Sequence, residues 1–299
     1  MMRNVCLTLL WIFLAFVGGK TQETQVTAFD GAFADQFGYA VAIAGEYAVV
    51  GAPLQGDFGT NNAGSAYIYQ NIAGTWTYVK KLVPPSGGSP GDQFGLSVDM
   101  DSNQVIVGAP YTDHYDLDDV GSAYIFRGSG STWTLEKHLI PYDGAANDHF
   151  ATDVGIDGNH AVVGAAADDD HGSSSGSAYI YGYHNYNWNF EEKIHASDAA
   201  ANDGFGTSVA IDSINVVVGA PGNIGADNKH SGAVYIFHPY VYGWHQADRL
   251  THSNPDYFDH LGESVAIEGG SIIAGAPFAN DKTGEAYVFS GMGYDWNQA

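Results

Sequence analysis

The chain has 299 residues, of which 45% are hydrophobic, so it can bury a sizeable core and is too apolar for global disorder. It carries 34 acidic against 10 basic residues, a net charge of -24. Such a surface repels nucleic acids and anionic membranes, so we expect neither as a partner, whereas divalent cations and cationic groups suit it.

The N-terminus has the features of a secretory signal peptide. Arg3 supplies a positive charge, and an apolar run of 13 residues follows from Val5 to Val17. A small-residue cleavage site ends at Gly19, so residues 1–19 are predicted to be removed and the mature protein to be secreted. The run is shorter than the roughly 20 residues of a membrane-spanning helix, and no later stretch is better, so we expect no membrane insertion. The single cysteine, Cys6, lies inside the signal, so no disulfide is expected.

The rest of the chain, residues 20–299, repeats one unit five times. An aromatic residue begins four copies and leucine begins the fifth, at steps of 57, 56, 55 and 56 residues (Phe37, Phe94, Phe150, Phe205 and Leu261). A glycine follows the same four steps (Gly51, Gly108, Gly164, Gly219 and Gly275). A shared period near fifty residues indicates a repeat architecture. We place the repeats at residues 29–84, 85–141, 142–196, 197–252 and 253–299.

Each repeat contains four predicted short strands. The first follows the aromatic residue, as in Tyr39–Ile43, and the second is apolar throughout, as in Val216–Val218, which is typical of a strand covered on both faces. Gly-Ala-Pro ends the second strand, because proline cannot donate to the ladder. The third strand carries aromatic residues, as in Tyr235–Phe237, and a tryptophan begins the fourth. Four short antiparallel strands per repeat, with glycines at fixed offsets, predict an all-β propeller of four-stranded blades.

The fourth strand carries half of the basic residues of the chain. They are Lys80, Lys81, Lys137, Lys193 and Arg249. Lysine on an outermost strand discourages edge-to-edge pairing, so we interpret these residues as gatekeepers without a role in ligand binding.

The pattern resembles the FG-GAP repeat found in the head of integrin α subunits and in secreted relatives. The resemblance rests on Phe-Gly, then about a dozen residues, then Gly-Ala-Pro, as in Phe205-Gly206 and Gly219-Ala220-Pro221, and it covers the chain from Asp30 onward. The Gly-Ser-Ala-Tyr variant with a downstream tryptophan is similar to extracellular microbial members. The resemblance implies a β-propeller, usually of seven blades, that binds protein or glycan partners and often calcium. It implies no catalytic activity.

A calcium loop would lie between the first and second strands, where most repeats have only a tight turn. One repeat keeps three oxygen ligands in the required spacing, and Asp99, Asp101 and Asn103 are therefore the candidate calcium ligands. Val107 stands at the closing position, so most of the six to eight oxygens that calcium needs would come from water and carbonyl groups. The alternative is a polar β-turn.

The number of repeats differs from the usual seven blades. The fifth repeat stops within its fourth strand, and the segment Gln22–Ala28 alternates as a strand would, so it is a candidate to complete the last blade. An alignment of Asp30 with Asp143 places Val26 on Leu139. Either the five blades close as a ring, or they are part of a larger propeller. We favour the second alternative, because the segment duplicates a strand whose start is already present.

The strand order places the connections from strand 4 to strand 1 and from strand 2 to strand 3 on one face, the loop face. An aspartate two places before the aromatic position recurs in all five 4–1 loops (Asp35, Asp92, Asp148, Asp203 and Asp259). A residue needed in every blade is more typical of the scaffold, where it closes a turn on backbone N–H groups. The 2–3 loops differ between blades, so we expect a ligand to be read there.

The candidate ligand-binding residues lie in the 2–3 loops of the second and third repeats. They are Asp113, Tyr115, Asp116, Asp118, Asp119, Asp168, Asp169 and Asp170. Their carboxylates suit a cation or a cationic ligand, and Tyr111 and Tyr115 could stack on a sugar ring. The alternative is a solvated acidic surface. Asp57, Asp227 and Asp281 lie in the 2–3 loops of the other repeats.

Catalytic motifs lack the structural context that they need. Two G-x-S-x-G matches, at residues 87–91 and 172–176, lie in polar loops and not at a strand-to-helix turn. The 12 histidines show no zinc-binding spacing. A glycoside hydrolase would need a pair of inner-strand acids, for which Asp99, Asp153 and Glu263 are the candidates.

The sequence therefore predicts a secreted, non-enzymatic recognition module for an extracellular protein or carbohydrate, with calcium as a candidate cofactor. A glycoside hydrolase and a purely structural surface component are the alternatives.

Overall fold

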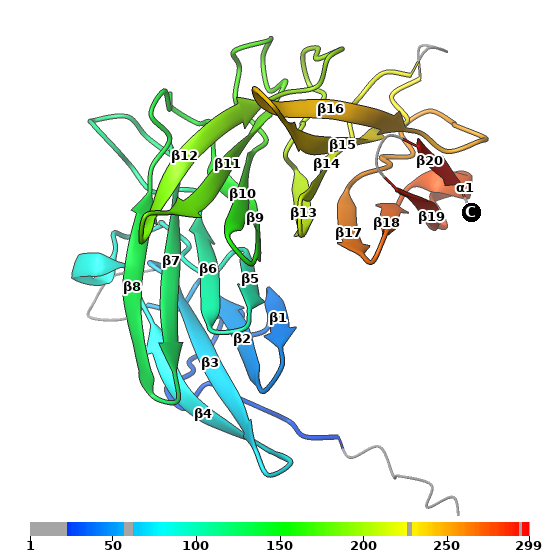
Figure 1. Cartoon of the computed structure of the whole chain (residues 1–299). Coiled ribbons are helices and arrows are strands. Elements are labelled where there is room, and N and C mark those ends of the chain that lie inside the picture. Colours follow the sequence, from blue (N-terminus) through cyan, green and yellow to red (C-terminus); the bar gives the residue numbers. More distant parts are fainter. Residues whose placement is uncertain (1–22, 57–61, 226–228, 293–294, 299) are drawn as a thin grey trace, which may run out of the picture.

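The computed structural model describes residues 23–56, 62–225, 229–292 and 295–298. The predicted signal peptide and the loop acids Asp57 and Asp227 lie outside the described residues. Five four-stranded antiparallel sheets, one for each repeat, stand as blades around a common axis (Figure 1). The predicted all-β propeller is confirmed. Across the described residues, no helix has the length and apolar character needed to cross a bilayer.

The strands follow the chain order within each blade, from the axis outward. The first blade consists of β1 (Val41–Ala44), β2 (Tyr47–Ala52), β3 (Ser65–Ile72) and β4 (Thr75–Leu82). The second consists of β5 (Val98–Asp101), β6 (Gln104–Ala109), β7 (Ser122–Ser129) and β8 (Thr132–Leu139). The third consists of β9 (Phe150–Asp157), β10 (His160–Ala165), β11 (Ser177–His184) and β12 (Asn187–Ile194). The fourth consists of β13 (Ser208–Asp212), β14 (Asn215–Ala220), β15 (Ala233–Tyr240) and β16 (Gly243–Leu250). The fifth consists of β17 (Ser264–Glu268), β18 (Ser271–Ala276), β19 (Glu285–Met292) and β20 (Asp295–Gln298). A 3-10 turn, η1 (Pro85–Gly87), and a single helical turn, α1 (Ala279–Lys282), lie in loops.

The second strand of each interior blade is buried on both faces, as its continuous apolar sequence predicts. All six residues of β6 are buried. One face packs on the preceding blade and the other on the following blade, so Val105 and Ile106 belong to two different hydrophobic clusters. The core of the propeller is therefore a series of layers between blades.

The two halves of the repeat motif meet across each boundary between blades. A Cβ on Gly51 or Gly219 would lie 2.0 Å from the carbonyl oxygen of Gly95 or Gly262, respectively, in the aromatic-glycine turn of the next blade. Gly95 and Gly262 have φ of +94° and +93°, which glycine adopts without steric cost. Gly-Ala-Pro therefore begins with glycine because the neighbouring backbone leaves no room for a side chain.

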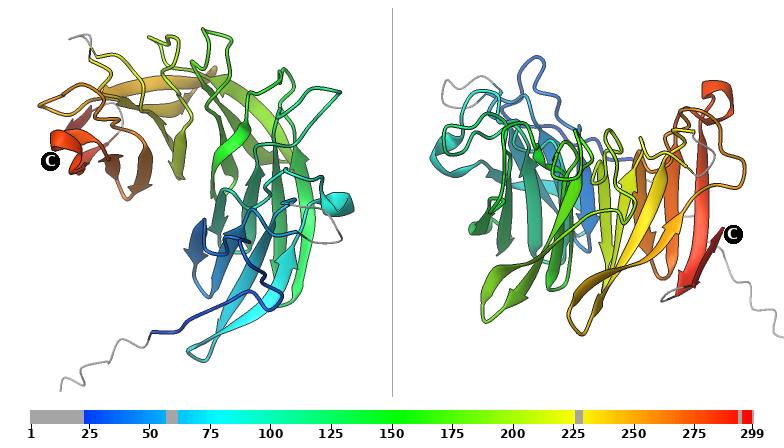
Figure 2. Two further views of the ribbon diagram at one scale, coloured as in Figure 1. Left: turned by 180° about the vertical axis from the view of Figure 1, so that it is seen from behind. Right: turned by 90° about the horizontal axis from the view of Figure 1, so that it is seen from above.

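The five blades form an open arc between the first and the fifth (Figures 1 and 2). The innermost strands β1, β5, β9, β13 and β17 pack against one another in that order. Val41 on β1 is 68% exposed, whereas Val98 at the same repeat position is 8% exposed. Ile273 on β18 is 48% exposed, whereas Ile106 at its repeat position is fully buried. Each end of the arc thus presents an apolar face of the kind that the interior blades bury.

The segment after the predicted signal does not pair with the fifth blade, whose sheet has the order β17-β18-β19-β20. Val26 and Ala28 pack against Tyr67 and Tyr69 of the first blade, and the Tyr69 hydroxyl donates to the Thr27 carbonyl over 2.9 Å. Residues 23–28 therefore do not complete the last blade, the role considered for Gln22–Ala28, because Val26 and Ala28 pack on the first blade; Gln22 lies outside the described residues.

Candidate functional site

The recurring aspartate is part of the scaffold in all five 4–1 loops. Each carboxylate is buried and accepts the backbone N–H of the residue three places earlier, over 2.6 to 3.0 Å (Asp35, Asp92, Asp148, Asp203 and Asp259). Burial raises the pKa of Asp92 and Asp203, and that of Asp148 to about 6. The predicted turn-closing role is confirmed.

The loops of neighbouring blades are joined through their backbones. The N–H at the aromatic position donates to a carbonyl in the 2–3 loop of the preceding blade, over 2.9 Å from Phe150 to Val120 and over 2.8 Å from Leu261 to Ser231. The 4–1 and 2–3 loops therefore share one face, as predicted. They form a continuous surface whose backbone is fixed and whose side chains vary.

Two acids in the 2–3 loop of the third blade form ion pairs with one lysine. Lys193 Nζ lies 2.7 Å from Asp168, 2.6 Å from Asp170 and 2.9 Å from Asp143 of the 4–1 loop. Burial opposes the charge on Lys193, but hydrogen bonds to these carboxylates and to Tyr179 outweigh it and raise the pKa of the lysine. Asp168 is consequently buried and structural, while Asp169 and Asp170 keep exposed side chains.

A similar cation cluster stands in the first and fourth blades. Lys81 pairs with Asp30 over 2.6 Å and lies over the ring of Tyr67. Arg249 pairs with Asp198 over 3.1 Å. Lys81, Lys193 and Arg249 therefore have a role beyond the predicted gatekeeping, because loop carboxylates hold their charged groups.

In the second blade, two histidines stand in place of the basic residue and the loop carboxylate that form the ion pair in the first, third and fourth blades. The His138 ring stacks on Tyr124, with centroids 4.4 Å apart, and Ser122 Oγ lies 2.9 Å from His138 Nε2 and 2.7 Å from His114 Nε2. Burial, and then the neighbouring His114, lowers the pKa of His138 to about 4; burial also lowers that of His114. Sequence spacing does not reveal this network, because its members come from a loop and two strands.

The 2–3 loop of the second blade carries five of the predicted ligand-binding residues. A bridge between His114 and Leu117 makes a short hairpin whose turn is Tyr115-Asp116, with φ of 54° and 65°. Asp113 accepts the N–H of Asp119 over 2.9 Å. The side chains of Tyr115, Asp116 and Asp118 are exposed, so this loop presents an aromatic ring and carboxylates to solvent.

The two groups of predicted ligand-binding acids are separated by the 4–1 loop that precedes the third blade. Asn147 N–H donates to the Asp118 carbonyl over 2.9 Å on one side of that loop. Ala167 N–H donates to the Asp148 carbonyl over 3.4 Å on the other side. The candidate residues therefore lie on one surface, with this loop between the two groups.

The candidate calcium ligands make other bonds. Asp99 accepts the N–H of Ile156 over 2.8 Å, and Asp101 accepts the N–H of Gly158 over 3.0 Å, both in the next blade. Asn103 Oδ1 lies 3.5 Å from the Arg127 guanidinium. Asp99 and Asp101 thus join blades, as do Asp157 and Asp212 further along the chain, whereas the Asn103 side chain contacts its own blade. Within the described ranges, no three His, Cys, Asp or Glu side chains are grouped so that they could hold a metal ion.

Two of the three inner-strand acids line a cavity of about 340 Å³ at the axis. These are Asp153 and Glu263, and all five innermost strands contribute to the walls. Burial raises the pKa of Asp153 to about 7 and that of Asp99 to about 6. The Asp153 carboxylate accepts the N–H of Val209 over 2.8 Å, so it serves, like Asp99, as a link to the next blade.

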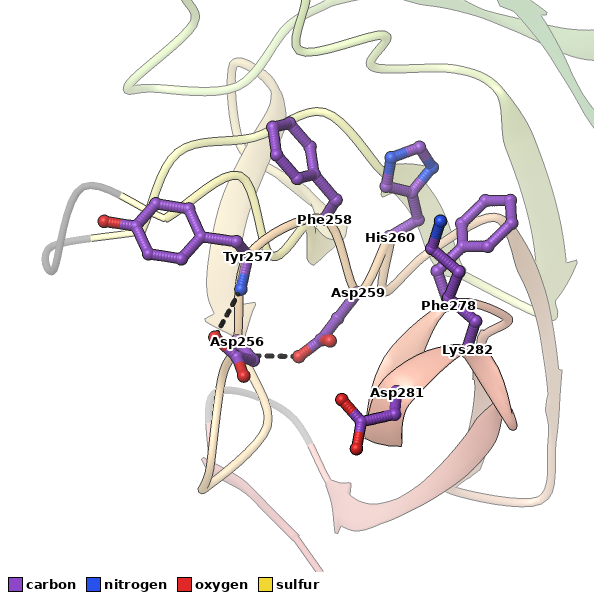
Figure 3. Close-up of a pocket in the computed structure, with 8 residues that line it drawn as sticks. All are labelled: Asp256, Tyr257, Phe258, Asp259, His260, Phe278, Asp281 and Lys282. Carbon is purple, nitrogen blue, oxygen red and sulfur yellow. Dashed lines mark hydrogen bonds between the residues drawn. The ribbon is translucent and has the colours of Figure 1, made fainter.

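A second cavity, of about 390 Å³, lies on the loop face of the fifth blade. The 4–1 loop and the 2–3 loop face one another across it (Figure 3), and its lining residues are Asp256, Tyr257, Phe258, Asp259, His260, Phe278, Asp281 and Lys282. The rings of Phe258, His260 and Phe278 lie along one edge, and the carboxylates of Asp259 and Asp281 lie below them. The sequence predicted Asp259 only as a turn-closing scaffold residue and Asp281 only as an acid of a 2–3 loop. The adjacent Tyr257-Phe258 pair in a 4–1 loop was the signal that could have identified this site.

A family model for the FG-GAP repeat matches five segments of the chain, at residues 21–69, 76–126, 133–181, 188–237 and 244–289. The last four segments each begin in the outermost strand of one blade and end in the third strand of the next. The sequence repeat is therefore offset by one strand from the blade, so each of these four copies spans a boundary between blades.

Proposed function

Because the chain belongs to the FG-GAP repeat family, we propose that it is a secreted, non-enzymatic recognition module that binds an extracellular protein or carbohydrate through its loop face. Propellers of this family are a type of binding module. The loop face as the binding surface and the extracellular location are the proposed parts.

One observation carries the proposal: the loop face combines a fixed backbone with side chains that differ between blades. Hydrogen bonds between successive loops, such as the 3.0 Å bond from Phe205 N–H to the Ser175 carbonyl, hold the surface in place before a partner arrives. A preorganised surface loses little conformational freedom on binding. The exposed Tyr115 and Tyr257 stand on this surface, and exposed aromatic side chains are typical anchors at recognition sites.

The proposal of a non-enzymatic role is supported by the state of the inner-strand acids. Asp99 and Asp153 are both committed to backbone N–H groups of the next blade. A glycoside hydrolase needs one carboxylic acid and one carboxylate flanking the bond that it cleaves. Their links between blades assign these two acids to the scaffold.

Secretion is proposed from the predicted signal at residues 1–19. Expression in a host with a secretory pathway, followed by N-terminal sequencing, tests it. We expect the protein in the medium with an N-terminus near Lys20. Retention of the intact chain in the cytosol would contradict secretion.

Binding is tested by screening the purified chain against arrayed glycans and purified extracellular proteins, with and without millimolar calcium. The matched variant changes Asp113, Asp116 and Asp118 to asparagine, which removes charge from the loop face and leaves the scaffold aspartates intact. A partner that binds the unchanged chain and also contacts the second blade should lose affinity for this variant. A chain that binds no arrayed glycan or protein under either condition would refute the proposed function.

A further inference from the structure

The geometry points to a saccharide-binding site in the fifth-blade cavity, between the loops Asp256–His260 and Phe278–Lys282 (Figure 3). The ligand class that fits it is a neutral pyranose sugar, alone or at the end of a glycan. This inference rests on the proposed function and narrows it, because it names one site and one of the two partner classes. The volume of about 390 Å³ lies within the range of small-ligand sites.

Phe258 is the first reason, because the scaffold does not favour an aromatic residue at its position. The residue three places before the aromatic landmark has positive φ in every blade, and the other blades have small or turn-forming residues there (Ala34, Gly91, Asn147 and Asn202). Phe258 has a φ of 64° and is 57% exposed. A bulky residue in the left-handed region is strained, and strain of this kind accumulates at functional sites. The strained and exposed ring is the first feature that assigns a binding role to Phe258.

The Phe258 ring is held by two aromatic neighbours and is still 57% exposed; the centroid of the Tyr257 ring lies 6.3 Å away, with the planes inclined by 44°. His230 of the fourth blade stacks on it with centroids 5.6 Å apart and planes inclined by 8°. The backbone N–H of Phe258 donates to the His230 carbonyl over 2.9 Å. The ring is thus backed by one parallel neighbour, and an aromatic face presented in this way suits the C–H face of a sugar ring.

The opposite loop has a backbone conformation specific to this blade. Asn280, Asp281 and Lys282 have φ of 53°, 56° and 68°, and three successive non-glycine residues with positive φ occur nowhere else in the part of the chain that the structure describes. The left-handed turn is anchored by the buried Ala279 and closed by Gly284 N–H on the Ala279 carbonyl over 3.0 Å. It places Asp281 across the cavity from the 4–1 loop (Figure 3).

The polar groups of the cavity favour a neutral hydroxylated ligand over a cationic one. Lys229 already lies over the Tyr257 ring at 5.9 Å and 3.8 Å from the Asp256 carboxylate, so a protein cation occupies that edge. Asp281 and Lys282 carry opposite charges, and their side chains form no hydrogen bond or ion pair within the described chain. A carboxylate only accepts and an ammonium only donates, whereas sugar hydroxyls do both, so a sugar can satisfy the two groups together.

Three variants test the site. Phe258→Asn introduces the residue that the same scaffold position carries at Asn147 and Asn202, so it should fold at least as stably as the parent chain. Asp281→Asn removes the free acceptor charge. Tyr186→Asn is the matched control, because Tyr186 is an exposed ring with a φ of 62° in the β11–β12 turn, away from the loop face.

The parent chain is first screened on arrayed neutral gluco-, galacto-, manno- and xylo-oligosaccharides. The strongest saccharide is then titrated into each variant by calorimetry, with saturation-transfer NMR as a second measure of contact. We expect Phe258→Asn to weaken binding at least about tenfold, Asp281→Asn to weaken it, and Tyr186→Asn to leave it within about twofold of the parent.

The outcomes separate this inference from the proposed function. Saccharide binding that is unchanged in Phe258→Asn overturns the site and leaves the proposed function standing. A parent chain that binds a purified protein or a cationic peptide but no neutral saccharide at millimolar concentration overturns the ligand class, again without touching the broader proposal. A chain that binds nothing in either screen refutes both.

Discussion

Lys193 and Asp168 form an ion pair of 2.7 Å in which the carboxylate side chain is only 2% exposed. The lysine side chain is 11% exposed and also contacts Asp143 and Asp170. One cation on the outermost strand of the third blade thus joins a 4–1 loop to a 2–3 loop. The loop face depends on such clusters for its shape.

Replacing Lys193 by methionine should destabilise the protein. The change leaves the buried Asp168 carboxylate without its cation, and breaking a buried pair in this way costs about 3 kcal/mol. Lys80→Met, on the outermost strand of the first blade, is the control and should change the free energy of unfolding by less than about 0.5 kcal/mol. Urea unfolding of both variants measures this; equal losses would contradict the structural role of Lys193.

Alanine in place of Gly219 should be far more damaging than alanine in place of Gly275, although both begin the same motif. A Cβ at residue 219 would lie 2.0 Å from the Gly262 carbonyl oxygen of the next blade, whereas at residue 275 the nearest atom is the movable Ser264 Oγ at 2.6 Å. We expect a loss of roughly 3 kcal/mol for Gly219→Ala and less than about 1 kcal/mol for Gly275→Ala. Thermal unfolding compares them, and similar midpoints would show that the contact between blades does not explain the glycine.

Because the arc is open at its ends, we expect the same substitution to cost less stability in the fifth blade than in an interior blade. Ile106→Ala removes a fully buried side chain from the boundary between the second and third blades, and should cost about 3 kcal/mol. Ile273→Ala removes a side chain that is 48% exposed, and should cost less than about 1.5 kcal/mol. Equal losses in chemical unfolding would mean that Ile273 is covered in solution.

Asp153 should make stability depend on pH. Burial raises its pKa from 3.8 to about 7, so the folded state binds this proton more tightly than the unfolded chain does. The free energy of unfolding should therefore fall as the pH rises from about 4 to about 7. Asp99, whose pKa is also raised, contributes in the same direction, and Glu263 lines the same cavity.

The variant Asp153→Asn measures how much the ionisation of Asp153 contributes to the pH dependence of stability. The amide oxygen still accepts the N–H of Val209 but cannot ionise, so we expect the variant to be more stable than the parent at pH 8, by on the order of 2 kcal/mol, and to match it near pH 4. Asp116→Asn, on an exposed turn, should follow the pH profile of the parent. Unfolding curves at pH 4, 6 and 8 suffice, and a parallel profile for Asp153→Asn would refute the assignment.

The periodic features of this chain could be predicted because they are local. The spacing of Phe205 and Gly219, and the apolar run Val216–Val218, express constraints that recur in every blade, so the strands and the blade architecture follow from them. The repeated aspartate was predictable for the same reason, since its partner is a backbone N–H three residues away.

The candidate site was predictable only in part. Placing the 2–3 loops on one face needs only the strand order, and Tyr115 is exposed there as expected. Whether an acid in such a loop is free or engaged depends on residues distant in sequence: Asp168 is held by Lys193, and Asp99 by the backbone of Ile156. Charge and spacing do not distinguish these cases.

The sequence by itself determined the strands, the repeat and the face on which the loops lie, because hydrophobic periodicity and glycine positions act over a few residues. Only the tertiary structure decided which acids are scaffold, that the arc stays open, and that Phe258 and Asp281 line the same cavity. Those outcomes depend on contacts between residues far apart in the chain, and a repeat pattern that is nearly the same in every blade does not encode the differences between blades.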